Sequence, residues 1–201
     1  MRLPAEQRRR QLLDVAQTVF ADRGFHATSM DDVAAAAGVT KPVLYQHFAN
    51  KRALFAELLD DVGSQLLEAL ATATARATTG RARVEEGFAE YFAFVTEHPA
   101  AFRLLFGASV RNDPEFARQA QRSLDAAADA ISSLIDVPLD DEHRLVLAHA
   151  VVGIAEATSR RSIAGDDAMA HTDASQLASW LAELTWFGLR GVRGARIATP
   201  D

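Results

Sequence analysis

Residues 29–48 constrain the fold of this chain more than any other stretch, because residues that fix the backbone occupy its key positions. The first of them, a serine, can cap a helix, and Asp32 faces the positive end of that helix dipole. Gly38 permits the positive φ angle of a tight turn. Thr40 can cap a second helix whose first turn holds Pro42, where a missing amide does no harm. We therefore predict two short helices joined by a tight turn, a helix-turn-helix.

The side chains of this motif divide into an inward and an outward set. The inward set is apolar and is expected to contact a preceding helix: Val33, Ala37, Leu44 and Phe48. The outward set shares one face of the second helix: Lys41, Pro42, Tyr45, Gln46 and His47. An exposed proline, tyrosine and amide on one short helix suit the major groove of DNA better than a solvated surface. A helical hairpin in an ordinary core, with no role in DNA binding, is the alternative.

Each outward residue has a role that its chemistry suits. Lys41 can reach guanine or phosphate, Gln46 can pair with adenine, and Pro42 can touch a thymine methyl group. Tyr45, His47 and the nearby Lys51 can donate hydrogen bonds to phosphate oxygens, which fixes the register of the helix on DNA.

The rest of the chain predicts an all-α fold. Alanine and leucine recur at helical spacing, and no run alternates polar with β-branched residues. Proline, glycine and capping residues set the expected helix ends. The expected helices cover residues 6–22, 30–37, 41–48, 51–77, 84–97, 100–107, 114–135, 140–164 and 174–190, with a polar loop at 165–172.

The composition limits the classes of protein to which the chain can belong. Its 201 residues include no cysteine, which excludes thiol catalysis and a cysteine zinc site. The longest strongly apolar stretch, residues 145–155, is shorter than the ~20 residues of a membrane span. The start of the chain has no apolar signal region. We expect a cytoplasmic protein with no membrane partner.

Charge is distributed unevenly along the chain. The net charge is -6, which by itself argues against a nucleic-acid partner. Residues 1–52, however, carry eight basic and five acidic side chains, a balance of +3, which leaves -9 for the remainder. This asymmetry predicts two parts with different partners, of which only the first approaches DNA.

The region 10–55 carries a dense set of characteristic pairs and runs. They are Gly24-Phe25, Thr28-Ser29, Ala37-Gly38-Val39-Thr40, Leu44-Tyr45, His47-Phe48 and Asn50-Lys51-Arg52-Ala53-Leu54. In these residues the chain resembles the DNA-binding domain of the TetR family of transcriptional regulators. The resemblance implies an N-terminal three-helix helix-turn-helix domain, residues 1–52, and a C-terminal helical bundle for ligand binding and dimerisation, residues 53–201. It also implies a homodimeric regulator, a repressor, that binds a near-palindromic operator in double-stranded DNA and is released by a small effector.

The resemblance also assigns candidate DNA contacts, with one departure from the family pattern. The positions that match are Thr40, Lys41, Pro42, Tyr45, His47 and Lys51, to which we add Gln46 and Ser29. Family members often carry a polar or basic residue near Met30 and Asp31, and neither of these side chains can donate to phosphate. Main-chain amides would have to supply contacts there. We therefore expect a modest, salt-sensitive affinity for DNA.

Aromatic residues gather in the middle of the chain, and two polar residues follow on a later helix. His149 and Glu156 lie seven residues apart, which is two helical turns, so they share a helix face. In the resembling family this region surrounds an apolar cavity with a few polar groups. The candidate effector site comprises Phe88, Tyr91, Phe92, Phe102, Phe106, Phe116, His149 and Glu156. A packed core is the alternative for the aromatic residues, and a subunit contact is the alternative for His149 and Glu156.

Apolar stripes mark the last two long helices as candidates for a dimer interface. The candidates are Leu145, Ala148 and Val152 on one helix, and Leu177, Trp180, Leu181 and Leu184 on the other. Such stripes can pack as a four-helix bundle across a two-fold axis. Burial within one chain is the alternative.

The sequence contains no arrangement of side chains that predicts catalysis. Its six histidines lack metal-ligand spacing, and it has neither a Gly-x-Ser-x-Gly elbow nor a glycine-rich phosphate loop. We therefore predict no catalytic residue, no metal and no cofactor. Two further functions stay open: a helical small-molecule-binding protein whose DNA module is non-functional, and a helical-bundle enzyme.

Overall fold

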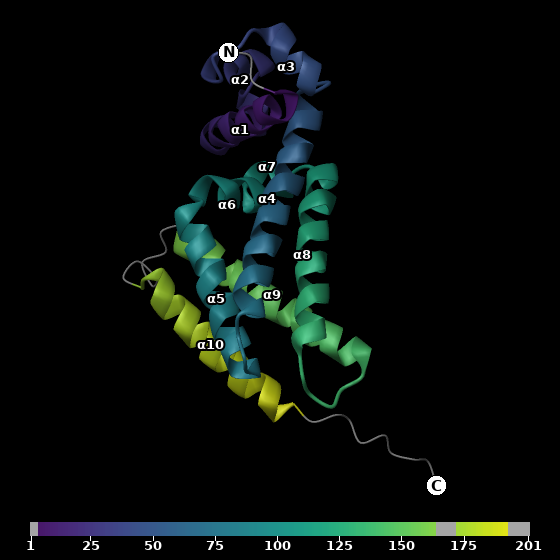
Figure 1. The fold of residues 1–201 in the computed structure, drawn as a ribbon, viewed down its shortest axis with the longest axis vertical. Helices are drawn as coiled ribbons and strands as arrows, with labels where there is room; N and C mark the ends of the chain where they lie inside the picture. The colour runs from purple at the N-terminus through teal and green to yellow at the C-terminus, as the bar shows by residue number, and fades with distance from the viewer. Residues whose placement is uncertain (1–3, 164–171, 193–201) are drawn as a thin grey trace. The chain divides into compact units, whose positions relative to one another are not determined.

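A computed structural model describes residues 4–163 and 172–192, and these residues are helical with no strand among them (Figure 1). The all-α fold is therefore confirmed. The helices are α1 (Ala5–Ala27), α2 (Met30–Ala36), α3 (Lys41–His47), α4 (Lys51–Ala75), α5 (Gly80–Glu97), α6 (Pro99–Phe106), α7 (Ala108–Arg111), α8 (Pro114–Leu134), α9 (Asp141–Ile163) and α10 (Ala174–Gly191). The loop expected at 165–172 lies almost wholly outside the described residues.

The chain forms two compact units. The first, here called the head unit, comprises the described residues of Met1–Gln65 and His98–Ser123. The second, the body unit, comprises the described residues of Leu66–Glu97 and Leu124–Asp201. These packing units differ from the division expected after Arg52, because α6, α7 and the start of α8 belong to the same unit as the helix-turn-helix.

Aromatic rings from three helices form the core of the head unit. Phe55 of α4 lies at its centre, with ring centroids 5.1 Å from Phe20, 5.1 Å from Phe25 and 4.6 Å from Phe116. All four side chains are buried. The edge-to-face and tilted ring geometry suits the quadrupole of the rings. This packing joins α1, α4 and α8 within the head unit.

The end of α1 differs from the expectation that the helix stops near residue 22. The helix bends at Gly24, whose φ of 76° is accessible to glycine at little cost, and then continues to Ala27. Beyond the bend, the Phe25 amide donates a hydrogen bond to Ser109 Oγ of α7 at 3.1 Å. The short helix α7 was not expected, because a single helical turn has no periodicity to detect.

In the body unit, α5 and α10 lie side by side and α9 packs against both (Figure 1). A separate cluster forms where Ala148 of α9 meets Ala128 and Ile135 at the end of α8. Leu145 and Val152 pack against this cluster. No helix in the described part of the chain is long and apolar enough to cross a membrane.

Candidate functional site

The helix α2 is held at its start by a reciprocal capping box. Ser29 Oγ accepts a hydrogen bond from the Asp32 amide at 3.1 Å, and the Ser29 amide donates to Asp32 Oδ2 at 2.8 Å. Hydrogen bonds from the Ser29 hydroxyl and amide hold the pKa of Asp32 below its usual range. The side chain of Ser29, a predicted DNA contact, is thus occupied in orienting α2.

The turn that follows α2 has the geometry that the sequence predicted. Gly38 has a φ of 65°, and the Val39 amide donates to the carbonyl of Ala34 at 3.0 Å. Thr40 occupies the N-cap position of α3, but its side chain makes no capping hydrogen bond, so that part of the prediction is wrong. Pro42 lies in the first turn of α3 as expected, where it needs no amide partner.

The side chains of α3 divide between core and solvent as predicted. Leu44 is fully buried and Val43 half-buried, whereas Lys41, Pro42, Tyr45 and Gln46 are exposed. Thr40 is exposed directly before them. The exposed residues project together from a helix whose opposite side is fixed in the core, which is the arrangement of a recognition helix.

His47 and Lys51, two of the predicted contacts, differ in how they are held within the head unit. His47 is half-buried, and its backbone carbonyl, not its ring, accepts a hydrogen bond from Arg9 at 2.6 Å. The ammonium of Lys51 donates to the carbonyls of Phe25 at 2.8 Å and Thr28 at 2.7 Å, and lies 4.5 Å from the ring centroid of Phe25. The sequence predicts that Lys51 donates to phosphate. Here it stabilises the end of α1, a partnership between residues that sequence spacing does not reveal.

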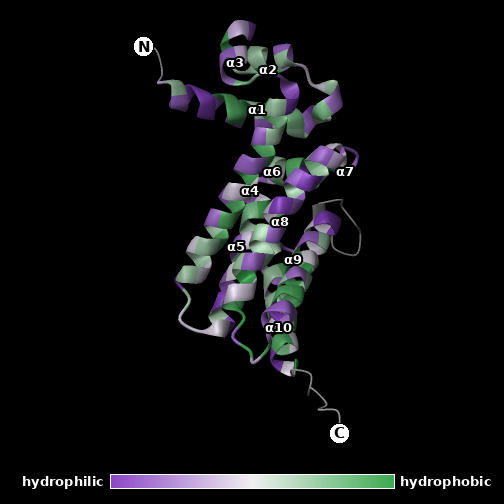
Figure 2. Cartoon of the chain, turned by 90° about the vertical axis from the view of Figure 1, so that its right-hand side faces the viewer, coloured by the Kyte–Doolittle hydropathy of each residue, from purple (hydrophilic) through white to green (hydrophobic). Residues whose placement is uncertain are grey.

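Most of the described cations of the head unit are paired with carboxylates of the same unit. The pairs are Arg9–Glu57, Arg10–Asp14, Arg10–Asp61, Arg23–Asp32, Lys41–Asp31, Arg52–Asp113, Arg52–Glu115 and Arg103–Asp22. Figure 2 shows hydrophilic residues over the first part of α1, where the arginines of this group begin. Most of the described basic side chains in residues 1–52 are therefore neutralised by nearby carboxylates, although the charge balance of this segment is +3.

Comparisons with known proteins agree with this geometry. A family model described as "Bacterial regulatory proteins, tetR family" matches residues 12–58, and one described as "Tetracyclin repressor-like, C-terminal domain" matches residues 80–188. The HTH-type transcriptional activator FasR of Mycolicibacterium smegmatis is 33% identical over 193 residues, which cover 95% of this chain and 87% of FasR. The chain belongs to the TetR family of bacterial transcriptional regulators.

Other TetR-family members match in part or in fold. The transcriptional repressor KstR2 of Rhodococcus jostii is 42% identical over 69 residues, 32% of this chain and 34% of KstR2. A solved TetR-like regulator from Rhodococcus sp. RHA1 has 32% identity and a TM-score of 0.75, covering 95% of this chain and all of that one. FadR of Bacillus subtilis, solved with stearoyl-CoA, has 17% identity and a TM-score of 0.74 over 92% of this chain and 99% of FadR, so it shares the fold.

The predicted effector residues are divided between the two units. Phe102, Phe106 and Phe116 belong to the head unit, and Phe88, Tyr91, Phe92, His149 and Glu156 belong to the body unit. Phe116 is fully buried in the aromatic core, and the rings of Phe102 and Phe106 pack 4.6 Å apart. These three rings pack in the core of the head unit, which was the alternative to an effector site. His149 is exposed, because α9 turns that residue away from its buried face.

In the body unit, Tyr91 of α5 and Ser159 of α9 bring buried hydroxyl groups close together. Burial raises the pKa of Tyr91 to about 12, an effect that the hydroxyl of Ser159 opposes and the Glu156 carboxylate strengthens. The oxygens of both hydroxyls are fully buried without a well-formed hydrogen bond in the described residues. Glu156 is half-buried and pairs with Arg160 at 3.3 Å. Ser159 and Arg160 were not predicted, because small and charged residues recur all around α9.

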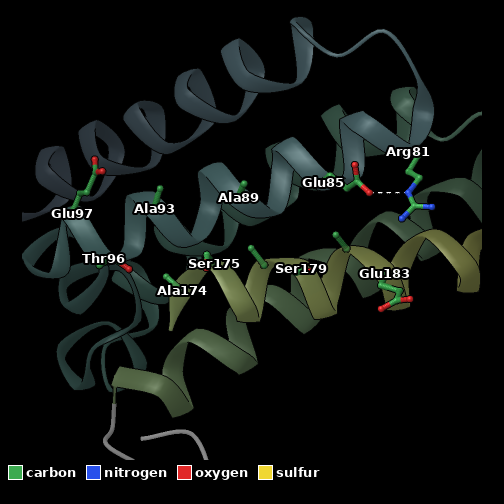
Figure 3. Close-up of a pocket in the computed structure, with 12 residues that line it drawn as sticks. Arg81, Glu85, Ala89, Ala93, Thr96, Glu97, Ala174, Ser175, Ser179 and Glu183 are labelled. Carbon is green, nitrogen blue, oxygen red and sulfur yellow. Dashed lines mark hydrogen bonds and ion pairs between the residues drawn. The ribbon is translucent and has the colours of Figure 1, made fainter. Parts of the chain in front are cut away.

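A groove of about 560 Å³ runs along the contact between α5 and α10 in the body unit (Figure 3). Small side chains line its middle: Ala89, Ala93, Ala178, Ser179 and Ala182. Charged residues stand at its ends, where Arg81 pairs with Glu85 at 2.7 Å. The predicted effector residues do not line this groove, and Tyr91 lies on the opposite side of α5 from the residues that do.

The predicted dimer residues lie on both sides of their helices. Leu145, Ala148 and Val152 face the cluster at the end of α8, and Leu177 is buried. These four residues lie on the faces of α9 and α10 that are buried within the chain, which was the alternative to a dimer interface. Trp180 and Leu184 of the predicted set are exposed on α10, as is Phe187, which was not predicted, at 54–59%. Val146, also not predicted, is exposed on α9. Leu181 lies between the two sets, half-buried.

Proposed function

We propose that this protein is an effector-responsive transcriptional regulator that binds a near-palindromic operator as a dimer. The observation that carries the proposal is the exposure of Pro42, Tyr45 and Gln46 on a helix whose other side, around Leu44, is buried. Side chains so placed can read base edges, because the major groove admits one α-helix. Residues 1–52 supply the DNA contacts, and residues 53–201 bind the effector and the second subunit.

The dimer forms through the outer faces of α9 and α10. Trp180, Leu184 and Phe187 follow i, i+4, i+7 spacing, so they form one exposed apolar stripe. On α9 the exposed residues Val146, Ala150, Gly153 and Ala157 are mostly small. A stripe of large residues beside a surface of small ones allows close packing across a two-fold axis. A stripe of this size left open to water is unfavourable for a monomer.

The effector carries an apolar chain with an uncharged carbonyl oxygen. Tyr91 stays a neutral phenol at physiological pH, so its hydroxyl can donate to a carbonyl oxygen. Ser159 can donate or accept beside it, and the Glu156 carboxylate disfavours a second anion. A thioester or ketone carbonyl fits these groups better than a free carboxylate. The stearoyl-CoA bound to FadR, which shares this fold, belongs to that chemical class.

Repression is the output that we propose, through occupancy of the operator and release by the effector. KstR2, matched over 32% of this chain, is named a repressor, whereas FasR, matched over 95% of it, is named an activator. The position of the operator decides between them. An operator that overlaps the promoter supports repression, and one upstream of an intact promoter contradicts it.

Selection of genomic fragments by the purified protein tests the function. We expect the bound fragments to share an inverted repeat with half-sites centred about 34 Å, one turn of DNA, apart. Fragments without a shared sequence contradict the proposal and favour the alternative, a small-molecule-binding protein with a non-functional DNA module. Members of the family are transcriptional regulators, so the helical-bundle enzyme is not proposed.

A further inference from the structure

An acidic side chain stands beside the proposed DNA-reading face of the head unit. Asp31 Oδ2 accepts a hydrogen bond from Lys41 Nζ at 3.0 Å, and the two side chains are 65% and 53% exposed. Asp31 lies in the first turn of α2, and Lys41 lies in the first turn of α3. The ion pair therefore spans the turn of the motif on its solvent side.

The backbone of both partners is fixed. The capping box holds the residue after Asp31, and the side chains of Met30 and Val33 on α2 are buried. Lys41 adjoins Pro42, whose φ is restricted, and Leu44 anchors α3 in the core. The backbone of Asp31 is therefore held in place relative to α3.

Lys41 differs from the other paired cations of the head unit in its surroundings. Arg9 and Arg10 of α1 pair with carboxylates of α4, and Arg52 of α4 pairs with Glu115 of α8 and with Asp113 directly before it. Lys41 belongs instead to the exposed set that includes Tyr45 and Gln46. A phosphate or a guanine must therefore compete with Asp31 for the ammonium of Lys41.

We propose that Asp31 is a specificity-determining residue that restrains Lys41 and penalises binding to DNA of arbitrary sequence. This inference rests on the proposed function. Non-specific binding depends on phosphate contacts, and a phosphate near this pair meets a neutralised lysine and a repelling carboxylate. In an operator, Lys41 leaves Asp31 for a guanine edge, and the freed carboxylate can accept from a cytosine amino group. The cost of opening the pair is then recovered only on the correct sequence.

The test compares Asp31→Asn with Asp22→Asn by fluorescence anisotropy. Asp22 provides a matched control, because it is also exposed and pairs at 3.6 Å with Arg103 of α6, not with a residue of α2 or α3. The probes are a 30-base-pair duplex of arbitrary sequence and a duplex recovered by genomic selection. For the arbitrary duplex we expect Asp31→Asn to tighten binding roughly 3- to 10-fold and to steepen the salt dependence by about one phosphate contact. Binding to the recovered duplex should tighten less, so the ratio of the two affinities falls.

A double-mutant cycle with Lys41→Met separates this role from plain repulsion of phosphate. If Asp31 acts through Lys41, Asp31→Asn changes binding to the arbitrary duplex less than about 2-fold in the Lys41→Met background. An undiminished effect in that background overturns the proposal. So does an equal gain on both duplexes, or a gain no larger than that of Asp22→Asn. Wild-type protein that binds neither duplex contradicts the proposed function itself, a result distinct from all of these.

Discussion

Arg52 Nη2 donates to both carboxylate oxygens of Asp113, at 2.8 and 2.9 Å, and so joins the start of α4 to the start of α8 within the head unit. The same guanidinium donates through Nε to Glu115 at 2.6 Å and lies 4.6 Å from the ring centroid of Phe116. One side chain thus connects the proposed DNA-binding segment to a helix that continues into the body unit.

Arg52→Gln is expected to lower the melting temperature by about 2–4 °C at neutral pH, because it removes the ion pairs with Asp113 and Glu115 and the ring contact. Arg81→Gln is the control, since Arg81 forms an exposed pair with Glu85 one turn away and should change the melting temperature little. Equal melting temperatures for the two variants contradict the role of Arg52.

The effect of Arg52→Gln should also depend on pH. Burial alone raises the pKa of Asp113, but hydrogen bonds from Arg52 and two backbone amides outweigh it, so the net shift is downward. A carboxyl with a lowered pKa in the folded state stabilises the protein above its unfolded pKa, about 4, and loses that contribution as the pH falls through the folded value. The difference between wild type and Arg52→Gln should therefore shrink below pH 4. A difference that grows on acidification is the contrary result.

Lys51→Met should lower the free energy of unfolding by about 1–3 kcal/mol, because it leaves the carbonyls of Phe25 and Thr28 without their charged donor. Lys41→Met removes an exposed lysine of the reading face and should leave the melting temperature unchanged while weakening DNA binding. Urea unfolding of both variants checks the contrast. If Lys51→Met has the same free energy of unfolding as the wild type, the structural role of Lys51 is contradicted, and the prediction that it donates to DNA phosphate is favoured.

The sequence predicted those features of the head unit that are determined by residues only a few positions away in the chain. Gly38, Pro42 and the Asn50 side chain, which accepts from the Ala53 amide at 2.8 Å, act on residues within a few positions of themselves. The partners of Lys51 lie 23 and 26 residues away, so no spacing rule indicates them. On α9 the error arose because alanine, valine and leucine occur all around the helix, and only the position of α8 decides which side is buried.

Leu184→Glu is expected to convert the proposed dimer to a monomer, because it places a charge in the middle of the exposed α10 stripe. Ser179→Glu adds the same charge to the same helix on its groove side and should leave the dimer intact. Light scattering coupled to size exclusion at micromolar concentration measures both. A dimeric Leu184→Glu protein shows that the interface lies elsewhere.

Tyr91→Phe should weaken binding of stearoyl-CoA about 10-fold or more, because the phenol proposed to donate to the carbonyl is lost while the ring remains. Thr185→Val also deletes a buried hydroxyl of the body unit, but one on α10, and should leave the affinity unchanged. Calorimetry with stearoyl-CoA and with stearate separates the two ligand classes. Tighter binding of stearate than of stearoyl-CoA contradicts a site for an uncharged oxygen.

The central claim, that the exposed face of α3 reads DNA, is tested most directly by the affinity of a Tyr45→Ala/Gln46→Ala double variant for a duplex recovered by genomic selection. Both side chains are exposed, so the variant should keep the wild-type circular dichroism and melting temperature. The account predicts a loss of roughly 100-fold or more at fixed salt, from one lost base contact and one lost phosphate contact. An affinity equal to that of the wild type would contradict it.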